Sequence, residues 1–353
     1  MHGIPRIGAL PSGARDLISD VAGVTVGHVT LADGAIQTGV SVVLPHQRDP
    51  FLYKAPAAAT VINGFGKSAR LIQVRELGVL ETPIALTNTF AVGAVASAQI
   101  RQAIGRHREI GRAWPTLNPL VFECNDGYLN DIQVASVTEQ HYAQACASAT
   151  ASFEQGCVGA GRGMSCFGLK GGIGSASRLA VLRDGRRYGC GALVLANFGR
   201  LENLCVAGKP LGQWLSTHHA SAGSGHAEPD KGSIITIIAT DAPLDARQIT
   251  RLAKRAAVAL ARMGSAYGHG SGDIALAFST AYQIPHHAHE AMPALAMLHE
   301  SHMDALFEAC AQAVEQAIVH ALWHAVSVTG RDGHRRLALV DALPQWPMLL
   351  NGK

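Results

Sequence analysis

The chain is poor in charged and in aromatic side chains. Of its 353 residues, 16% are charged and 5% are aromatic, whereas roughly a quarter of an average soluble chain is charged. Apolar residues make up 48%, so we expect much of the surface to be hidden from water, either in thick layers of structure or between subunits. The 38 glycines favour tight turns and strands that pack on small side chains.

Several features that mark particular classes of protein are missing. The basic residues are scattered and the formal net charge is only +3, which argues against a nucleic-acid partner. No apolar run approaches the length of a membrane span, and residues 1–20 lack the apolar core of a secretory signal. The seven cysteines have no CxxC spacing, which favours reduced thiols. We therefore expect a cytoplasmic protein without a membrane or nucleic-acid partner.

Strand-like and helical segments alternate along the chain. Strands are expected at "GVTVGHVTL", "TGVSVVLP", "AATVING", "TPIALTNT", "PLVFE" and "DIALAFST", and a hairpin over 177–199 with its turn at Asp184-Gly185. Helical spacing appears in "AVGAVASAQIRQAIGRH", in 136–155 after a start at Ser136 or Thr138, and from about Pro293 to His324. No repeat or low-complexity linker interrupts the pattern. The sequence predicts one mixed α/β domain over 1–353.

A further helix is expected after Asp245. Asp245 and Gln248 have the spacing of a capping box, and apolar residues recur at helical spacing from Ile249 to Met263. The basic residues in this stretch occupy other faces, so we interpret them as a solvated helix side rather than a binding patch.

The junction Gly232–Ser233 separates a long polar segment of small residues from a β-branched run, Ile234 to Ala239. A serine hydroxyl can attack the carbonyl that precedes it, and a glycine at that carbonyl permits the strained geometry that attack requires. Cleavage would leave Ser233 with a hydroxyl nucleophile and an α-amine, whose reference pKa of about 7.7–8.0 suits a base. A serine at a strand start is more often merely exposed, so this junction needs support from elsewhere.

Three other segments supply that support. "GHGSGDIALAF" places Ser271 and Asp273 in a glycine-rich turn before a strand, and "LVLANFGR" ends a strand with Asn197, whose amide could donate to an oxyanion. "FECNDGYLND" places several polar side chains in one loop after a strand, among them Glu123 and Tyr128. Each segment taken alone is an ordinary turn or strand end.

Taken together, these motifs resemble the L-aminopeptidase/D-amidase-D-esterase family, which includes the β-peptidyl aminopeptidases. The likeness runs in order through "DVAGVTVGHVTL", "NGFGK", "LETPIALTNT", "ECNDGYLND", "GAGRGMSCFGLKGGIGSASR", "ANFG", "GSIITIIATDAPL" and "GSGDIALAFST". It implies an α/β (α+β) fold, a four-layer αββα sandwich that resembles N-terminal nucleophile hydrolases but differs in connectivity and is shared with ornithine acetyltransferases. It also implies autoproteolysis into chains 1–232 and 233–353, and a homotetramer of processed pairs.

The resemblance also implies roles at the junction. Ser233 becomes the nucleophile and the first residue of the smaller chain, and Gly232 the new C-terminus of the larger one. Ser271 and Asp273 would bind the Ser233 end and tune its amine and hydroxyl, while Asn197 would contribute to the oxyanion hole.

Two more residues are expected at the substrate. Tyr128 would line the site near the tetrahedral intermediate, and Glu123 would hold the free amino group of the substrate. Cys124 stands where the family often has threonine, a nearly isosteric change. Arg162 replaces a frequent threonine, and we expect it to reshape the preference for the acyl residue.

Two other kinds of site were weighed against this interpretation. The histidine-rich stretches "PHHAHE" and "HESH" offer His286, His287, His289, Glu290, His299, Glu300 and His302 as metal ligands, but they lack HExxH spacing. "GAGRGMSCFGLKGG" lacks the GKS/T of a phosphate loop and precedes a strand rather than a helix. We therefore expect no metal and no cofactor.

The sequence thus predicts a hydrolase that removes the N-terminal residue of small peptides, amino-acid amides or esters through an acyl-enzyme on Ser233. Two alternatives stay open. An acyltransferase of the same fold would pass the acyl group to an amine instead of water, and a non-catalytic binding protein would keep its junction uncut. The preference among L-α, D-α and β-aminoacyl groups depends on pocket shape and is not predicted.

Overall fold

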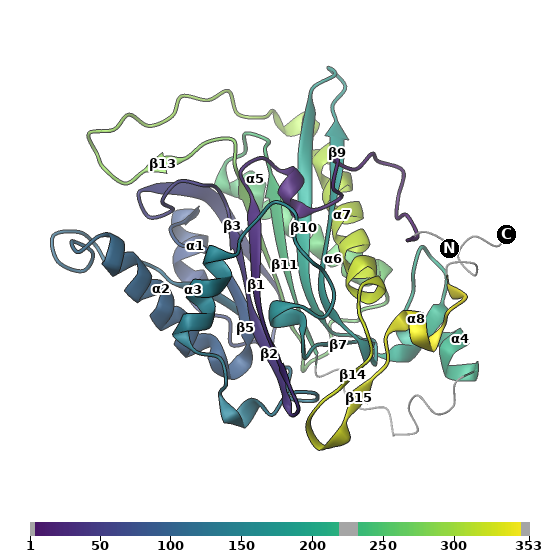
Figure 1. The fold of residues 1–353 in the computed structure, drawn as a ribbon. Coiled ribbons are helices and arrows are strands. Elements are labelled where there is room, and N and C mark those ends of the chain that lie inside the picture. The colour runs from purple at the N-terminus through teal and green to yellow at the C-terminus, as the bar shows by residue number, and fades with distance from the viewer. Residues whose placement is uncertain (1–3, 219–231, 347–353) are drawn as a thin grey trace.

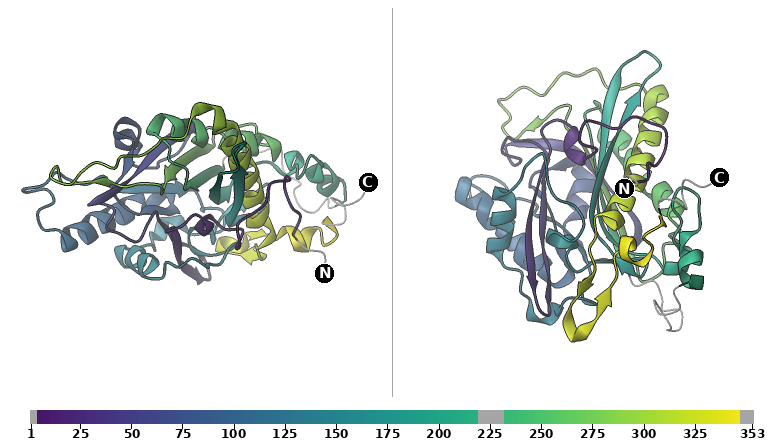
Figure 2. Two further views of the ribbon diagram at one scale, coloured as in Figure 1. Left: turned by 90° about the horizontal axis from the view of Figure 1, so that it is seen from above. Right: turned by 45° about the vertical axis from the view of Figure 1, so that its right-hand side comes forward.

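Two β-sheets lie face to face between two layers of helices (Figure 1). The computed structural model describes residues 4–218 and 232–346. Figure 2 shows the same layers from above and after a turn of 45°, with two helices of the first half of the chain outside one sheet and the long helix near the C-terminus outside the other. This arrangement confirms the predicted four-layer αββα sandwich.

The smaller sheet has four strands in the order β1-β2-β5-β6. Only β5 and β6 run parallel. The strands are β1 (Thr25–Asp33), β2 (Ile36–Leu44), β5 (Ile84–Asn88) and β6 (Leu120–Cys124). Its outer face is covered by α2 (Val92–Arg106) and α3 (Glu139–Ala147).

The larger sheet has seven strands in the order β13-β3-β12-β11-β10-β9, with β4 paired to β3. Its central pair, β11 and β12, is parallel and the other neighbours are antiparallel. The strands are β3 (Tyr53–Gly64), β4 (Val79–Leu80), β9 (Gly172–Val181), β10 (Arg187–Asn197), β11 (Ser233–Thr240), β12 (Gly272–Ser279) and β13 (Ile284–Pro285).

The remaining elements surround these layers. The outer face of the larger sheet is covered by α5 (Ala246–Ala253), α6 (Ala256–Arg262) and α7 (Met303–Trp323). Two short hairpins lie at one end of the sandwich, β7 (Ser165–Cys166) with β8 (Leu169–Lys170), and β14 (Val328–Thr329) with β15 (Arg335–Arg336). Three short helices complete the set, α1 (Leu71–Leu77), α4 (Leu211–His218) and α8 (Leu339–Ala342). No helix in the described part of the chain has both the length and the hydrophobicity needed to cross a membrane.

Strand β11 is buried along its whole length because both faces of its sheet are covered. Ile235 and Ile237 pack toward the smaller sheet, while Ile234 and Ile238 pack toward the helices. The β-branched run that looked unusual in the sequence is therefore a central strand, where continuous hydrophobicity replaces alternation.

Most expected elements are present. The hairpin at Asp184-Gly185 joins β9 to β10, and Gly185 supplies the positive φ of its turn. The predicted capping box is confirmed, because Asp245 Oδ1 accepts from Gln248 N at 2.7 Å and Gln248 Oε1 accepts from Asp245 N at 3.2 Å. Helix α3 begins after Thr138, one of the two expected starts.

Three helix predictions need correction. The helix expected over 136–155 already ends at Ala147. The helix expected from Pro293 begins only at Met303, because the apolar side chains before it, such as Met292 and Met297, are exposed and have no surface on which to form a helical face. The helix after Asp245 is divided into α5 and α6 at residues 254–255. The backbone bonding there tightens from the fourth to the third preceding residue, as Arg255 N donates to Leu252 O.

Candidate active site

Ser233 is the first residue of β11 and lies between the ends of two neighbouring strands. It pairs with Asn197 of β10 on one side and with Gly272 of β12 on the other. Its side chain is buried, with a relative exposure of 5%, and its Oγ accepts a hydrogen bond from the Gly272 N–H at 3.1 Å. The register of the sheet thus places three of the predicted motifs, around 197, 233 and 272, side by side.

Gly232 is required by a close approach of two backbones. A Cβ at this position would lie 2.2 Å from Asn197 O and 2.6 Å from Phe198 Cα. The φ angle of Gly232 is outside the left-handed region, so the glycine is explained by lack of space rather than by backbone strain. A side chain here would push the end of β10 away from the junction.

Ser271 and Asp273 are held together directly beside the junction. Both are buried, and Ser271 Oγ donates to Asp273 Oδ1 at 2.6 Å. They flank Gly272, whose N–H is the donor to Ser233 Oγ. A hydroxyl and a carboxylate thus lie on either side, along the chain, of the residue that donates to Ser233 Oγ, and their roles at the nucleophile stay a prediction.

Asn197 is fixed in one orientation at the end of β10. Its Oδ1 accepts from the Ser165 N–H at 2.8 Å, and its Nδ2 donates to Asn125 O at 3.1 Å. Because a backbone N–H needs an acceptor, these partners settle which side of the amide is oxygen. Among the described residues no acceptor takes the second hydrogen of this Nδ2, which suits the amide as an oxyanion donor.

Glu123 lies at the end of β6, on the sheet that faces the junction. It is 2% exposed, and its carboxylate accepts from the Lys67 N–H at 2.6 Å and from the Thr89 hydroxyl. A Cβ placed on Gly66 would lie 3.5 Å from both Glu123 Oε1 and Gly272 Cα. One glycine therefore separates this carboxylate from the strand that contacts Ser233, and the two sheets meet at the site.

Tyr128 is joined to the site through the C-terminal hairpin. Its ring stacks on His334 with centroids 4.8 Å apart, and Arg336 Cζ lies 3.7 Å from the ring centroid. Arg336 Nε donates to Ser165 Oγ at 3.1 Å. The tyrosine is 38% exposed, and its connection to Asn197 runs through Arg336 and Ser165.

Two further groups lie at the site, although no role was predicted for them from the sequence. Cys124 Sγ donates to Ser233 O at 3.4 Å, and burial, followed by the charges of Glu123 and Asp273, raises the pKa of this thiol well above its usual value. Burial also raises the pKa of Asp126 to about 6, while Asn130 Nδ2 donates to its Oδ1 at 3.0 Å. Cys124 and Asp126 belong to the quoted motif "ECNDGYLND", but no spacing in it distinguishes them.

Lys170 is the most important residue of this region that was not predicted from the sequence. Its side chain is fully buried, and its Nζ donates to the carbonyls of Gly161, Met164 and Gly171 at 3.0, 2.9 and 2.8 Å. Burial lowers its pKa to about 8. The sequence could have marked this residue only as the one lysine in a glycine-rich segment, because the carbonyls that bind it are not encoded by side-chain type.

Arg162, expected to shape the acyl pocket, is half-buried at the end of a short 3-10 turn, Gly159–Gly161. Its Nε donates to Gln37 Oε1 at 2.6 Å. Its influence on substrate preference stays a prediction.

The histidines weighed as metal ligands make other contacts. His286 and His287 pack around Trp114, with ring centroids 5.1 and 5.0 Å from its ring. Glu300 pairs with Arg247 and Arg251. Within residues 4–218 and 232–346, no group of three or more potential ligands is arranged to hold a metal ion.

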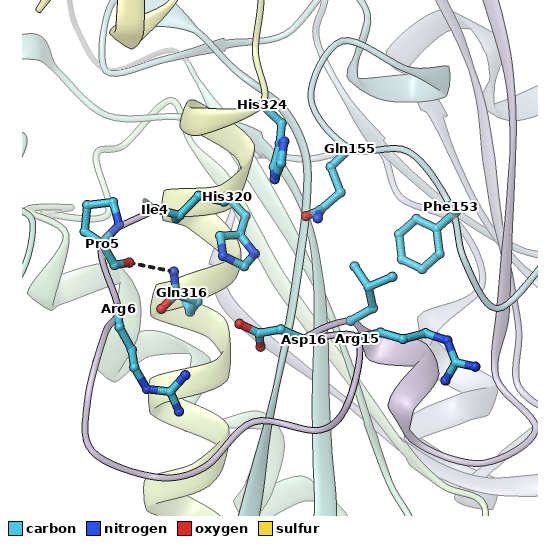
Figure 3. A pocket seen from close by; sticks show the side chains of 11 residues that line it. Ile4, Pro5, Arg6, Arg15, Asp16, Phe153, Gln155, Gln316, His320 and His324 are labelled. Atoms are coloured by element: carbon cyan, nitrogen blue, oxygen red, sulfur yellow. Dashed lines mark hydrogen bonds between the residues drawn. The ribbon is translucent and has the colours of Figure 1, made fainter. Parts of the chain in front are cut away.

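A cavity of about 410 Å³ lies elsewhere, between the N-terminal segment and α7 (Figure 3). Asp16, Gln155, His320 and His324 surround it in Figure 3, and none of the seven predicted site residues contributes to its lining. His320 Nδ1 is 2.6 Å from Ser175 O, and burial lowers the pKa of this imidazole. The cavity is thus separate from the junction.

The chain resembles known peptidases over most of its length. Residues 16–336 match Peptidase family S58. The beta-peptidyl aminopeptidase BapA of Sphingosinicella microcystinivorans is 37% identical over 355 residues, covering 94% of this chain and 87% of that protein. The crystal structure of the PH0078 protein from Pyrococcus horikoshii OT3 superposes with a TM-score of 0.89 at 45% identity, over 98% of this chain and 96% of that one.

A third relative bears on the fold. The L-aminopeptidase D-Ala-esterase/amidase of Ochrobactrum anthropi, described as a variant of the Ntn hydrolase fold, superposes with a TM-score of 0.85 at 31% identity, over 98% of this chain and 97% of that one. Both the predicted family and the predicted fold are therefore confirmed. The chain belongs to peptidase family S58 and is a hydrolase of the aminopeptidase type.

Proposed function

We propose that this hydrolase processes itself at Gly232–Ser233 and then uses Ser233 Oγ to remove the N-terminal residue of small peptides, amino-acid amides or esters. The observation that carries the proposal is the position of Ser233, buried at the start of β11 between Asn197 and Gly272. The names of its relatives, two aminopeptidases and an esterase/amidase among them, support the substrate class.

Self-processing begins with attack of Ser233 Oγ on the carbonyl carbon of Gly232. The C–N bond breaks, an ester forms between Gly232 and Ser233 Oγ, and the proton of the hydroxyl ends on the released amine. Water then hydrolyses the ester to a Gly232 carboxylate and a free Ser233 hydroxyl. The absence of a side chain on Gly232 keeps its carbonyl close to the end of β10, where Asn197 can act as donor.

Turnover of substrate repeats the same attack on a different carbonyl. The new α-amine of Ser233, with a reference pKa of about 7.7–8.0, accepts the hydroxyl proton and later delivers it to the leaving group. Asn197 Nδ2 binds the oxyanion, and water releases the acyl group from the serine. Ser271 and Asp273, joined at 2.6 Å, position the amine of Ser233.

The substrate is held by its free amino group. Glu123 supplies a buried carboxylate at the edge of the junction, and Tyr128 forms part of the wall toward the C-terminal hairpin. Two relatives are named beta-peptidyl aminopeptidases, so we expect β-aminoacyl substrates to be accepted along with α-aminoacyl ones.

The proposal also includes the oligomeric state and the cellular location of the protein. A homotetramer of processed pairs would cover exposed apolar side chains such as Phe90, Met292 and Met297. All seven cysteines are free thiols, which supports a reducing, cytoplasmic location.

Ser233→Ala provides the test. We expect denaturing mass spectrometry to give two fragments that meet at Gly232/Ser233 for the wild type and one intact chain for the variant. Hydrolysis of L-, D- and β-aminoacyl p-nitroanilides should fall at least about 10³-fold. Ser216→Ala, on the exposed side of α4, is the control and should process normally. An active wild-type enzyme recovered as a single chain would refute the proposal.

A further inference from the structure

A continuous chain of hydrogen bonds connects the buried ammonium of Lys170 to the amide of Asn197. Lys170 Nζ donates to Met164 O at 2.9 Å. The N–H of the same peptide unit belongs to Ser165, and it donates to Asn197 Oδ1 at 2.8 Å. A cation therefore lies at one end of a polarisable peptide, and the side-chain amide of Asn197 lies at the other.

We propose that Lys170 is a positioning and polarising residue of the oxyanion hole, acting on Asn197 through the Met164–Ser165 peptide. The inference rests on the proposed function, in which Asn197 Nδ2 binds the oxyanion. An ammonium at a carbonyl oxygen draws electron density from the peptide and strengthens its N–H as a donor. That N–H in turn polarises the Asn197 amide, so its Nδ2 hydrogens become better donors to a developing negative charge.

The surroundings of Lys170 fit a role beyond holding a loop. In the described part of the chain the ammonium forms no salt bridge and is bound by three carbonyls. Met164 O also accepts from the Gly171 N–H at 2.9 Å, so both acceptor positions of this carbonyl are used. The field of a buried cation without a counter-charge acts strongly on the groups that are bound to it. One of these groups is the Met164–Ser165 peptide, which is hydrogen-bonded to Asn197.

The charge state of Lys170 is open to titration near working pH. The titratable groups that influence it are Cys157 ahead of the 3-10 turn, Arg162 at the end of that turn, and Cys166 on β7. Burial is the largest cause and Arg162 acts in the same direction, so the pKa is lowered to about 8. The ammonium and its effect on Asn197 are therefore lost as the pH rises through this value.

The first test is the pH dependence of kcat for an aminoacyl p-nitroanilide. In the wild type, kcat should rise as the Ser233 amine loses its proton and fall again above about pH 8 as Lys170 does. Lys170→Arg keeps a positive charge at all these pH values, so its descending limb should disappear even if its maximum is lower. A wild type without a descending limb, or a variant with an unchanged one, overturns the proposal.

The second test is a double-mutant cycle. Lys170→Met should lower kcat about tenfold, less than the 10²–10³-fold typical for removing an oxyanion donor itself, and with little change in KM. In an Asn197→Ala background the same substitution should cost less than about twofold, because its effect passes through Asn197. Additive losses overturn the inference and indicate that Lys170 only supports the loop.

Controls separate this inference from the proposed function. Lys54→Met removes another half-buried lysine, which donates to Phe51 O at 2.8 Å far from this chain of bonds, and should leave kcat and its pH profile unchanged. If Ser233→Ala retains activity, the proposed function fails. If Ser233→Ala is inactive but the Lys170 tests give the contrary result, the inference alone fails.

Discussion

Lys170 and Arg178 are both fully buried cations, yet they are used in different ways. Arg178, on β9 near the cavity of Figure 3, donates to Asp16 Oδ1 at 3.0 Å and also to Gln316 Oε1 at 2.8 Å. Lys170, near the junction, has carbonyl partners and no carboxylate among the described residues. A carboxylate therefore balances the charge of Arg178, whereas no carboxylate in the described part of the chain balances the charge of Lys170.

The same contrast extends to the acids of the two regions. Asp16 accepts from both the Ser177 N–H and Arg178, whereas burial raises the pKa of Asp126, near the junction, to about 6. Burial without a counter-charge moves a pKa toward the physiological range, as it does for Lys170 and Asp126. The cavity region is therefore expected to anchor the fold, and the junction to carry the chemistry.

The largest expected effect is a loss of stability when Arg178 is replaced. Arg178→Met should lower the free energy of unfolding by about 3–5 kcal/mol, because it leaves the partly buried Asp16 and the buried Gln316 without their cation. Turnover per processed molecule should stay the same. Denaturant unfolding of the uncleaved Ser233→Ala form, with and without Arg178→Met, measures this cost on one continuous chain.

The exposed Arg187 of the same hairpin is the matched control, and Arg187→Met should cost less than about 0.5 kcal/mol. An Arg178→Met protein with full stability but lost turnover would contradict the assignment of the cavity region to stability and of the junction to catalysis.

Replacement of Asp126 should have a smaller effect on stability, and this effect depends on pH. The pKa of Asp126 is raised in the folded protein to about 6 from 3.8, so the folded state binds more protons between these values and stability falls as the pH rises through them. The difference corresponds to roughly 2–3 kcal/mol. Asp126→Asn should remove this loss above pH 6 and make the unfolding free energy flatter between about pH 4 and 6.

Urea titrations at pH 4.5 and 7 in the Ser233→Ala background test this prediction. Asp33→Asn at the exposed end of β1 is the control and should leave the pH dependence unchanged. An unchanged pH dependence in Asp126→Asn would show that the pKa of Asp126 is not raised in the folded protein.

The strands themselves were predictable from the sequence. β11 and β12 have β-branched or alternating apolar residues, and Asp184-Gly185 marks the turn of the hairpin. The register that pairs Ser233 with Asn197 and Gly272 was not predicted, because pairing between segments distant in the chain leaves no local pattern. The family resemblance implied only that the motifs around these positions share one site. Lys170 was out of reach for a related reason. Its partners are carbonyls, which every residue has.

The helix expected over 293–302 shows the opposite error. Its apolar residues have helical spacing, but spacing alone does not supply a surface to pack on, and Leu295 and Met297 remain exposed. A backbone contact from Leu298 N to Pro243 O holds this segment instead.

The smallest expected effect compares two serines, one in each region. Ser177 Oγ donates to Asp20 Oδ2 at 2.7 Å and accepts from the Gly13 N–H at 3.0 Å, so Ser177→Ala should cost about 1–2 kcal/mol of stability and leave kcat unchanged. Ser165 Oγ accepts from Arg336 Nε at 3.1 Å.

Ser165→Ala should cost about 1 kcal/mol or less but lower kcat a few-fold, because it removes one hydrogen bond of the guanidinium that lies over Tyr128 while keeping the backbone N–H to Asn197. Both variants remove one hydrogen-bonded hydroxyl, so the difference in kcat between them reports where the hydroxyl lies in the molecule. Parallel measurements of unfolding free energy and kcat decide the matter. If Ser177→Ala lowers kcat more than Ser165→Ala does, the anchor region is coupled to catalysis and the division drawn between the two buried cations does not hold.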